Sequence, residues 1–163
     1  MKILIEKFVS NILEGEYIEN YYIFGKLENG DPIEFSDYNL IGEELKDFIN
    51  KKVNCLLKAF SFDLLDIILN PDVDTSYYSI FKGNFIEKYF IPEPFASFKS
   101  SSYSTIGKVY KGGYPAMRTD NGIILIDKEV FKFKLGEKKI NEGDSIYIDV
   151  NRLDLVSWHP IEE

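Results

Sequence analysis

Residues 17–36 read YIENYYIFGKLENGDPIEFS, and this stretch predicts two β-strands joined by a tight turn. Residues 17–24 are rich in aromatic and β-branched side chains, which favour strands. Glu28-Asn29-Gly30-Asp31 follows, and Asn and Gly tolerate the positive φ that hairpin turns need. Residues 32–36 then alternate apolar and polar side chains with the period of a strand. We therefore expect a mainly β protein.

One short helix is expected after this hairpin, roughly from Leu40 to Asn50, with Asn39 as its N-cap. Its apolar residues lie at helical spacing on one face, and charged residues occupy the other. A long strand or strand pair is predicted over residues 52–65. Strand, hairpin, helix and returning strand within the first 70 residues resemble an OB-like small barrel, in which a helix closes one end after the third strand.

Several stretches recur in the same order, which suggests two copies of one unit. Residues 8–18 return as 81–91, Glu28-Asn29-Gly30 as Asp120-Asn121-Gly122, residues 49–50 as 140–141, and residues 62–65 as 153–156. In the second half, strands are predicted at residues 123–126, buried on both faces, and at 130–135, 145–150 and 153–156. We expect two tandem OB-like β-barrel units from an internal duplication, residues 1–70 and 78–163, with residues 70–76 as the linker. The alternative is a single β-sandwich in which each copy gives one sheet.

The composition bounds the class of protein. Of 163 residues, 45% are hydrophobic, which is ample for a core, and the formal charge of −8 opposes a surface that binds phosphates throughout. The single cysteine, Cys55, lies in an apolar run and is expected to be a buried, inert thiol. No stretch has the length of a signal peptide's apolar region or a membrane span, so we expect a soluble, cytoplasmic protein without a membrane partner.

Catalytic groups are scarce. His159 is the one histidine, which disfavours Ser-His-Asp and Cys-His catalysis, and without a Cys/His cluster no zinc site is expected. Residues 72–76 lack the glycine and glutamate of a calcium loop, and residues 107–113 lack the order of a phosphate-binding loop. We therefore predict no enzyme, no cofactor and no metal. A carboxylate-based enzyme stays open as a third class, because sequence cannot place 27 acidic residues in space.

An insertion in the second copy, loop 92–119, holds the candidate ligand-binding residues. From Pro94 to Thr119 the chain has four cations and no Asp or Glu. Aromatic rings stack on bases and cations neutralise phosphates, so this mixture is typical of a groove for single strands. An ordinary serine-rich surface loop is the alternative reading. The candidate residues are Phe98, Lys99, Tyr103, Lys108, Tyr110, Lys111, Tyr114 and Arg118.

Two functions from different classes follow. The leading hypothesis is a non-catalytic binding protein that recognises a protein partner, as an immunity-type or inhibitor protein would, because the surface is acidic and rich in tyrosine. The alternative is an OB-like protein that binds single-stranded nucleic acid through residues 94–119.

Overall fold

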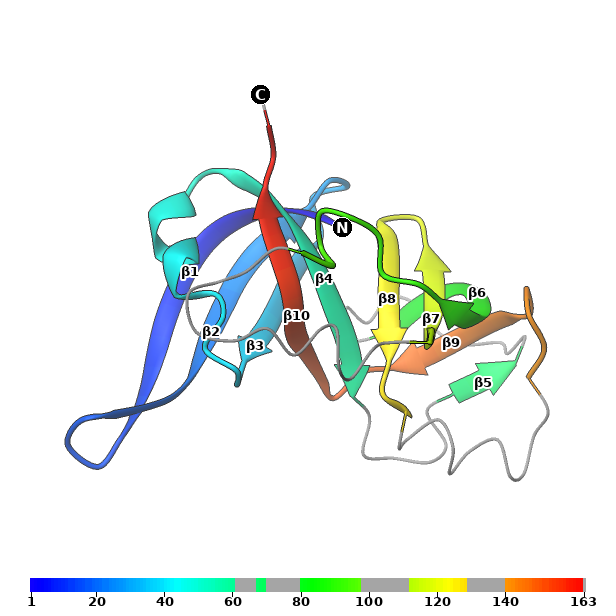
Figure 1. Ribbon diagram of the computed structural model, residues 1–163, viewed down its shortest axis with the longest axis horizontal. Helices are drawn as coiled ribbons and strands as arrows, with labels where there is room; N and C mark the ends of the chain where they lie inside the picture. Colours follow the sequence, from blue (N-terminus) through cyan, green and yellow to red (C-terminus); the bar gives the residue numbers. More distant parts are fainter. Residues whose placement is uncertain (61–66, 70–79, 98–111, 129–139, 163) are drawn as a thin grey trace.

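The computed structural model describes residues 1–60, 67–69, 80–97, 112–128 and 140–162, without the side chains of 67–69 (Figure 1). The 3-10 helix η1 covers Glu43–Phe48. In the first half the strands are β1 (Lys2–Leu13), β2 (Tyr17–Leu27), β3 (Pro32–Asp37), β4 (Lys52–Phe60) and β5 (Ile67–Leu69). In the second half they are β6 (Ile80–Tyr89), β7 (Tyr114–Thr119), β8 (Gly122–Ile126), β9 (Ser145–Asp149) and β10 (Arg152–Pro160).

Five strands close a β-barrel in the order β1-β2-β3-β10-β4 and back to β1. Neighbours are antiparallel except for β3 and β10, which run parallel where Asp154 lies beside Ser36. The last strand of the chain therefore completes a barrel begun by the first four, as the red strand beside β4 shows in Figure 1. The prediction of a mainly β protein with a barrel is confirmed.

The remaining strands extend this barrel as a sheet in the order β8-β7-β6-β9-β5. The extension begins at β4, because one edge of that strand is shared between two partners. Lys52–Asn54 pairs with the start of β1, whereas Leu57–Ala59 pairs with β8 in parallel. The ten described strands thus belong to one hydrogen-bonded sheet.

The main hydrophobic core fills the barrel and continues under the extension. It joins barrel residues such as Ile5, Ile23 and Leu57 to Phe85 and Met117 of β6 and β7. A second cluster lies on the opposite face of β4, β8 and β10, where Leu56, Tyr114, Ala116, Leu125 and Val156 pack together and Phe95 covers them. Ile124 and Leu125 are both fully buried, as expected for a strand covered on both faces.

The helix predicted over residues 40–50 is wrong in its bounds, its type and its cap. The observed 3-10 helix covers Glu43–Phe48 and has no side-chain cap at its start. The carboxylate of Asp37, at the end of β3, instead accepts the backbone N–H groups of Ile41 at 3.2 Å and Gly42 at 2.6 Å. Because Asp37 is fully buried and holds the chain in this turn, it takes the role expected of Asn39.

Both predicted Asn-Gly turns are present, with positive φ at each glycine. Gly30 has φ +90° and Gly122 has φ +123°. The turns differ, however, because Leu27 and Asp31 enclose three residues, whereas Thr119 pairs directly with Gly122 around two.

The predicted duplication is not confirmed. Residues 8–18 contain the turn between β1 and β2, whereas their expected counterparts up to Tyr89 form the single strand β6. β10, from the predicted second unit, also pairs with β3 and β4 of the first. The division at residues 70–78 and the strand at 130–135 lie outside the described residues.

Candidate binding groove

The outer face of β2 and β3 carries aromatic side chains that the barrel interior does not use. Successive residues of a strand point to opposite faces, so Tyr21 and Ile23 are buried inside while Tyr22 and Phe24 lie half-buried outside. Ser36 of β3 lies opposite Tyr22, and Glu34 lies opposite Phe24. This face is therefore both aromatic and polar.

A groove with a volume of about 800 Å³ runs over this face towards the junction of β9 and β10. Its aromatic lining comes from β2, β3, the segment after β3, and β6, while its polar lining includes two glutamates and one arginine. The lining residues are Glu6, Tyr22, Phe24, Gly25, Pro32, Ile33, Glu34, Phe35, Ser36, Tyr38, Phe81, Val150, Asn151, Arg152 and Leu153. Its size and mixed lining are those of a binding site.

A β-bulge places Glu6 at the groove. Between Ile5 and Lys7 the β1–β2 register shifts, and Glu6 is the extra residue. Bulges re-aim side chains in this way. The Glu6 carboxylate lies 2.9 Å from the ammonium of Lys26, so it is ion-paired. Gly25 permits the close approach of the two strands, because a Cβ there would lie 2.4 Å from the carbonyl oxygen of Leu4.

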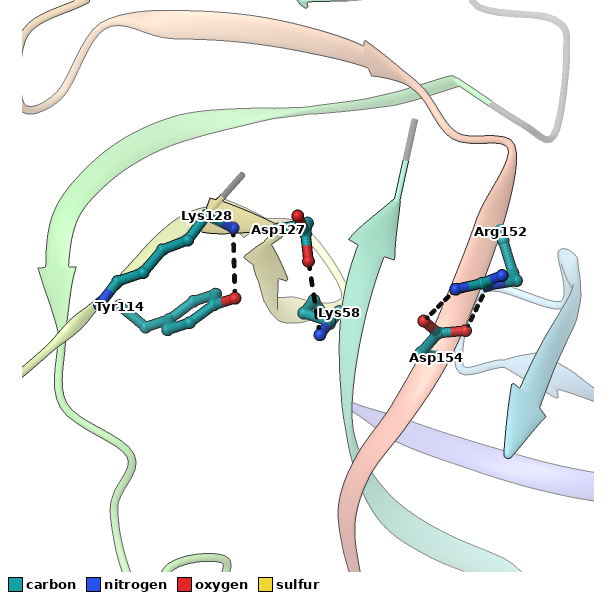
Figure 2. A network of polar contacts seen from close by, with 6 residues as sticks. All are labelled: Lys58, Tyr114, Asp127, Lys128, Arg152 and Asp154. Atoms are coloured by element: carbon teal, nitrogen blue, oxygen red, sulfur yellow. Dashed lines mark hydrogen bonds and ion pairs between the residues drawn. The ribbon is translucent and has the colours of Figure 1, made fainter. Parts of the chain in front are cut away.

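Arg152, the one cation among the described lining residues, is held by its neighbours. Its Nε and Nη2 donate to the two carboxylate oxygens of Asp154 at 2.7 and 2.9 Å. Its guanidinium lies over the rings of Tyr38 and Phe60, 4.7 and 4.9 Å from their centroids. The hydrogen bond to Asp154 raises the pKa of the Arg152 guanidinium above its ordinary value. Figure 2 shows this paired arrangement, which fixes the guanidinium and balances its charge.

Glu34 differs from the other charged lining residues. Its carboxylate makes no ion pair or hydrogen bond with any described residue, and its side chain is exposed beside Phe24. Because Glu6 and Arg152 are each paired, Glu34 is the described charged lining residue without an ion-pair partner. On the other side of Phe24, the ammonium of Lys7 lies over the Phe24 ring, 5.6 Å from its centroid. An unpaired carboxylate of this kind is complementary to a cationic group.

A second pair of polar contacts lies where β4 meets β8. The ammonium of Lys58 is 3.5 Å from the carboxylate of Asp127, and both side chains are largely buried. Lys58 also lies directly opposite Asp154 in the β10–β4 ladder. Figure 2 shows both ion pairs, Lys58 with Asp127 and Arg152 with Asp154.

The structure describes two of the eight residues predicted to bind a ligand. Tyr114 is buried in the second cluster, where its hydroxyl accepts the backbone N–H of Lys128 at 3.2 Å. Arg118 is exposed near the other end of the same strand. Phe98, Lys99, Tyr103, Lys108, Tyr110 and Lys111 lie outside the described residues. The insertion itself ends in β7 and begins against β10, where Ser157 donates to the carbonyl of Phe95 at 2.9 Å.

The thiol of Cys55 and the imidazole ring of His159 both pack against other parts of the protein. Cys55 is fully buried, and burial raises the pKa of its thiol to about 12. The His159 ring packs against Phe95 with centroids 4.7 Å apart. Among the described side chains, no three of His, Cys, Asp and Glu gather where they could hold a metal ion. In the same part of the chain, no helix is long and apolar enough to cross a membrane.

Comparisons with protein-family models, curated proteins and solved structures gave no match to this chain. The groove itself was missed by sequence reasoning, although one signal was present. The consecutive aromatic and apolar residues 21–24 place large side chains on both faces of β2, yet a barrel strand needs them only inside. These additional outward rings are the sequence signal of the groove.

Proposed function

We propose that this protein is a non-catalytic binding domain that recognises a protein partner, and that the groove over β2 and β3 takes an extended, basic segment of that partner. The observation that carries the proposal is the unpaired carboxylate of Glu34 beside Phe24. A Lys or Arg side chain of the partner would pair with Glu34.

An OB-like assignment of the barrel supports this proposal. Five strands close in the order β1-β2-β3-β10-β4, and η1 follows the third strand. OB-folds bind their ligands across the second and third strands and the adjoining loops. The groove occupies that face, and its far wall comes from Phe81 and Asn151, which both belong to the long segment between β4 and β10.

Single-stranded nucleic acid, the other class of ligand bound by OB-folds, is less well supported. Phosphate contacts need unpaired cations, whereas Arg152 is engaged by Asp154. Two carboxylates also line the groove and would repel a phosphate backbone. Arg118 is exposed, but it is not among the groove-lining residues. The charge of −8 points in the same direction.

The proposal is tested by selecting short random peptides displayed on phage against the immobilised protein. We expect the enriched peptides to carry Lys or Arg beside apolar residues, and to bind in calorimetric titrations. Glu34→Gln should weaken this binding roughly fivefold, because an exposed ion pair contributes up to about 1 kcal/mol.

Glu44→Gln is the matched control, since it removes the same charge from an exposed position on η1. Equal affinities for the wild type and Glu34→Gln would contradict the proposal. So would enrichment of acidic peptides. Tight binding of oligothymidine that falls steeply with salt would instead favour the nucleic-acid function.

A further inference from the structure

The hairpin end of β1 and β2, residues 10–20, projects from the barrel as an arm (Figure 1). β2 pairs with β3 only from Tyr21 onwards, and β1 pairs with β4 only over Lys2–Leu4. Within the described strands, this arm is therefore a ribbon of two strands without a third neighbour. Such ribbons are marginally stable in water, so an arm of this kind needs internal support or a partner.

Large apolar side chains are exposed at the end of this arm. Ile12 is 60% exposed, Leu13 50%, Tyr17 79% and Ile18 39%. They are four of the seven large hydrophobic residues that are exposed in the described part of the chain. Contiguous exposed apolar surface on a protein marks an interaction site more often than scattered residues do.

The register of the arm places these side chains on both of its faces. Ile12 lies opposite Ile18, and Leu13 lies opposite Tyr17. Residues directly opposite each other share a face, and successive pairs alternate between faces. One face of the arm therefore presents Ile12 and Ile18, while the other presents Leu13 and Tyr17. A partner that lay flat on one face would leave the other pair in water.

Polar contacts join the two strands of the arm at its base. The side-chain amide of Asn11 donates to the carboxylate of Glu19 and to the amide oxygen of Asn20, each at 3.0 Å. Asn20 is fully buried, so its hydrogen bond with Asn11 links the two strands of the arm next to the barrel. An arm ordered before binding loses less conformational entropy in a complex.

The charge of the arm selects the occupant. Residues 10–20 contain Glu14, Glu16 and Glu19 and no Lys or Arg. A second copy of the arm would bring these carboxylates against their own images, and an anionic membrane surface would repel them. A protein surface with an apolar cleft and a basic rim matches both the side chains and the charge.

From these observations we propose that the β1–β2 arm inserts into an apolar, basic-rimmed cleft of a partner protein, which covers both of its faces. This proposal concerns a surface separate from the groove and does not depend on it. Insertion distinguishes this mode from docking on one face, because both apolar pairs must then contribute.

The test begins with a photo-reactive benzoylphenylalanine in place of Tyr17, irradiated in cells that express the chain. We expect an adduct with one protein, whose cross-linked peptide lies in an apolar segment near Lys or Arg. That protein is then purified and titrated against variants of each face. Ile12→Ser/Ile18→Ser and Leu13→Ser/Tyr17→Ser should each weaken binding at least about tenfold.

Two controls separate insertion from general effects. Phe90→Ser removes an apolar residue that is 65% exposed outside the arm, and it should leave the affinity unchanged. Asn11→Ala retains all four apolar side chains but loosens the base, and it should weaken binding severalfold. Circular dichroism checks that each variant is folded.

If only one of the two double variants lost affinity, the insertion mode would be overturned. If neither lost affinity, the arm would not be the binding site. A cross-link to a second copy, to lipid or to nothing would also overturn it. Glu34→Gln in the same titration reports on the groove, so failure of one surface is distinguished from failure of the other.

Discussion

The indole N–H of Trp158 donates a hydrogen bond to the carbonyl oxygen of Ile41 across 3.0 Å, although 117 positions separate the two residues. The Trp158 ring also packs edge-on against Phe48 of η1, with centroids 5.4 Å apart. Through these contacts the last strand holds the 3-10 helix over the end of the barrel. The C-terminal strand is therefore as much a part of the barrel as the first four.

Replacing Trp158 by Phe should destabilise the protein by about 1–3 kcal/mol, because the buried carbonyl of Ile41 loses its donor. Urea unfolding followed by far-UV circular dichroism measures the free energy of unfolding. His159→Ala, at the partly exposed neighbouring position, should cost less. A larger loss at His159 than at Trp158 would contradict this account of the barrel end.

Gly30→Ala and Gly122→Ala should each cost about 1 kcal/mol or more, because both glycines have positive φ. The second change should cost more. A Cβ on Gly122 would lie 3.2 Å from the Cα of Met1, whereas nothing lies within 4 Å of a Cβ on Gly30. Thermal and urea unfolding measure both changes, and equal costs would show that the Met1 contact yields without strain.

The free energy of unfolding of the wild type minus that of Asp37→Asn should become smaller as the pH rises from 3.8 to the raised pKa of Asp37. Burial raises this pKa above the ordinary 3.8, more than the backbone hydrogen bonds from Gly42 and Ile41 lower it. The folded protein then binds the Asp37 proton more tightly than the unfolded chain, so the contribution of this group to stability declines with pH. Urea titrations at several pH values measure the difference, and an increase with pH would reverse the assigned sign.

The thiol of Cys55 should resist alkylation by iodoacetamide at pH 8 while the protein is folded. Burial raises its pKa to about 12, so the reactive thiolate is scarce and the reagent has no access. Mass spectrometry should detect full modification only after unfolding in urea. Rapid labelling of the native protein would show that β4 opens readily from the barrel.

The sequence predicted individual strands and turns of this fold better than it predicted which strands pair with one another. The aromatic run of β2 and the glycines of both turns report conformations decided within a few residues. Strand pairing depends on contacts remote in the chain, such as Asp154 beside Ser36 and opposite Lys58, so the place of β10 in the first barrel could not be read from a repeat. The helix was misjudged because a buried carboxylate, Asp37, controls the turn before it.

The candidate site was predictable only in part. The outward rings of Tyr22 and Phe24 were visible in the sequence as an apolar run, but their union with Glu34 and Arg152 depends on the barrel. Glu34 has no ion-pair partner because Lys26 pairs with Glu6 and Arg152 pairs with Asp154. These pairings depend on the tertiary structure.

The central claim, that the groove over β2 and β3 binds a basic segment, is tested most directly by chemical-shift mapping. The ¹⁵N-labelled protein is titrated with a selected Lys- or Arg-containing peptide. We predict that the largest shifts occur at residues 22–24, 34–38 and 151–153, and that Glu34→Gln reduces them at the same peptide concentration. Shifts confined to Tyr114–Thr119 or to other strands, with residues 22–24 and 34–38 unchanged, would contradict the assignment of the groove.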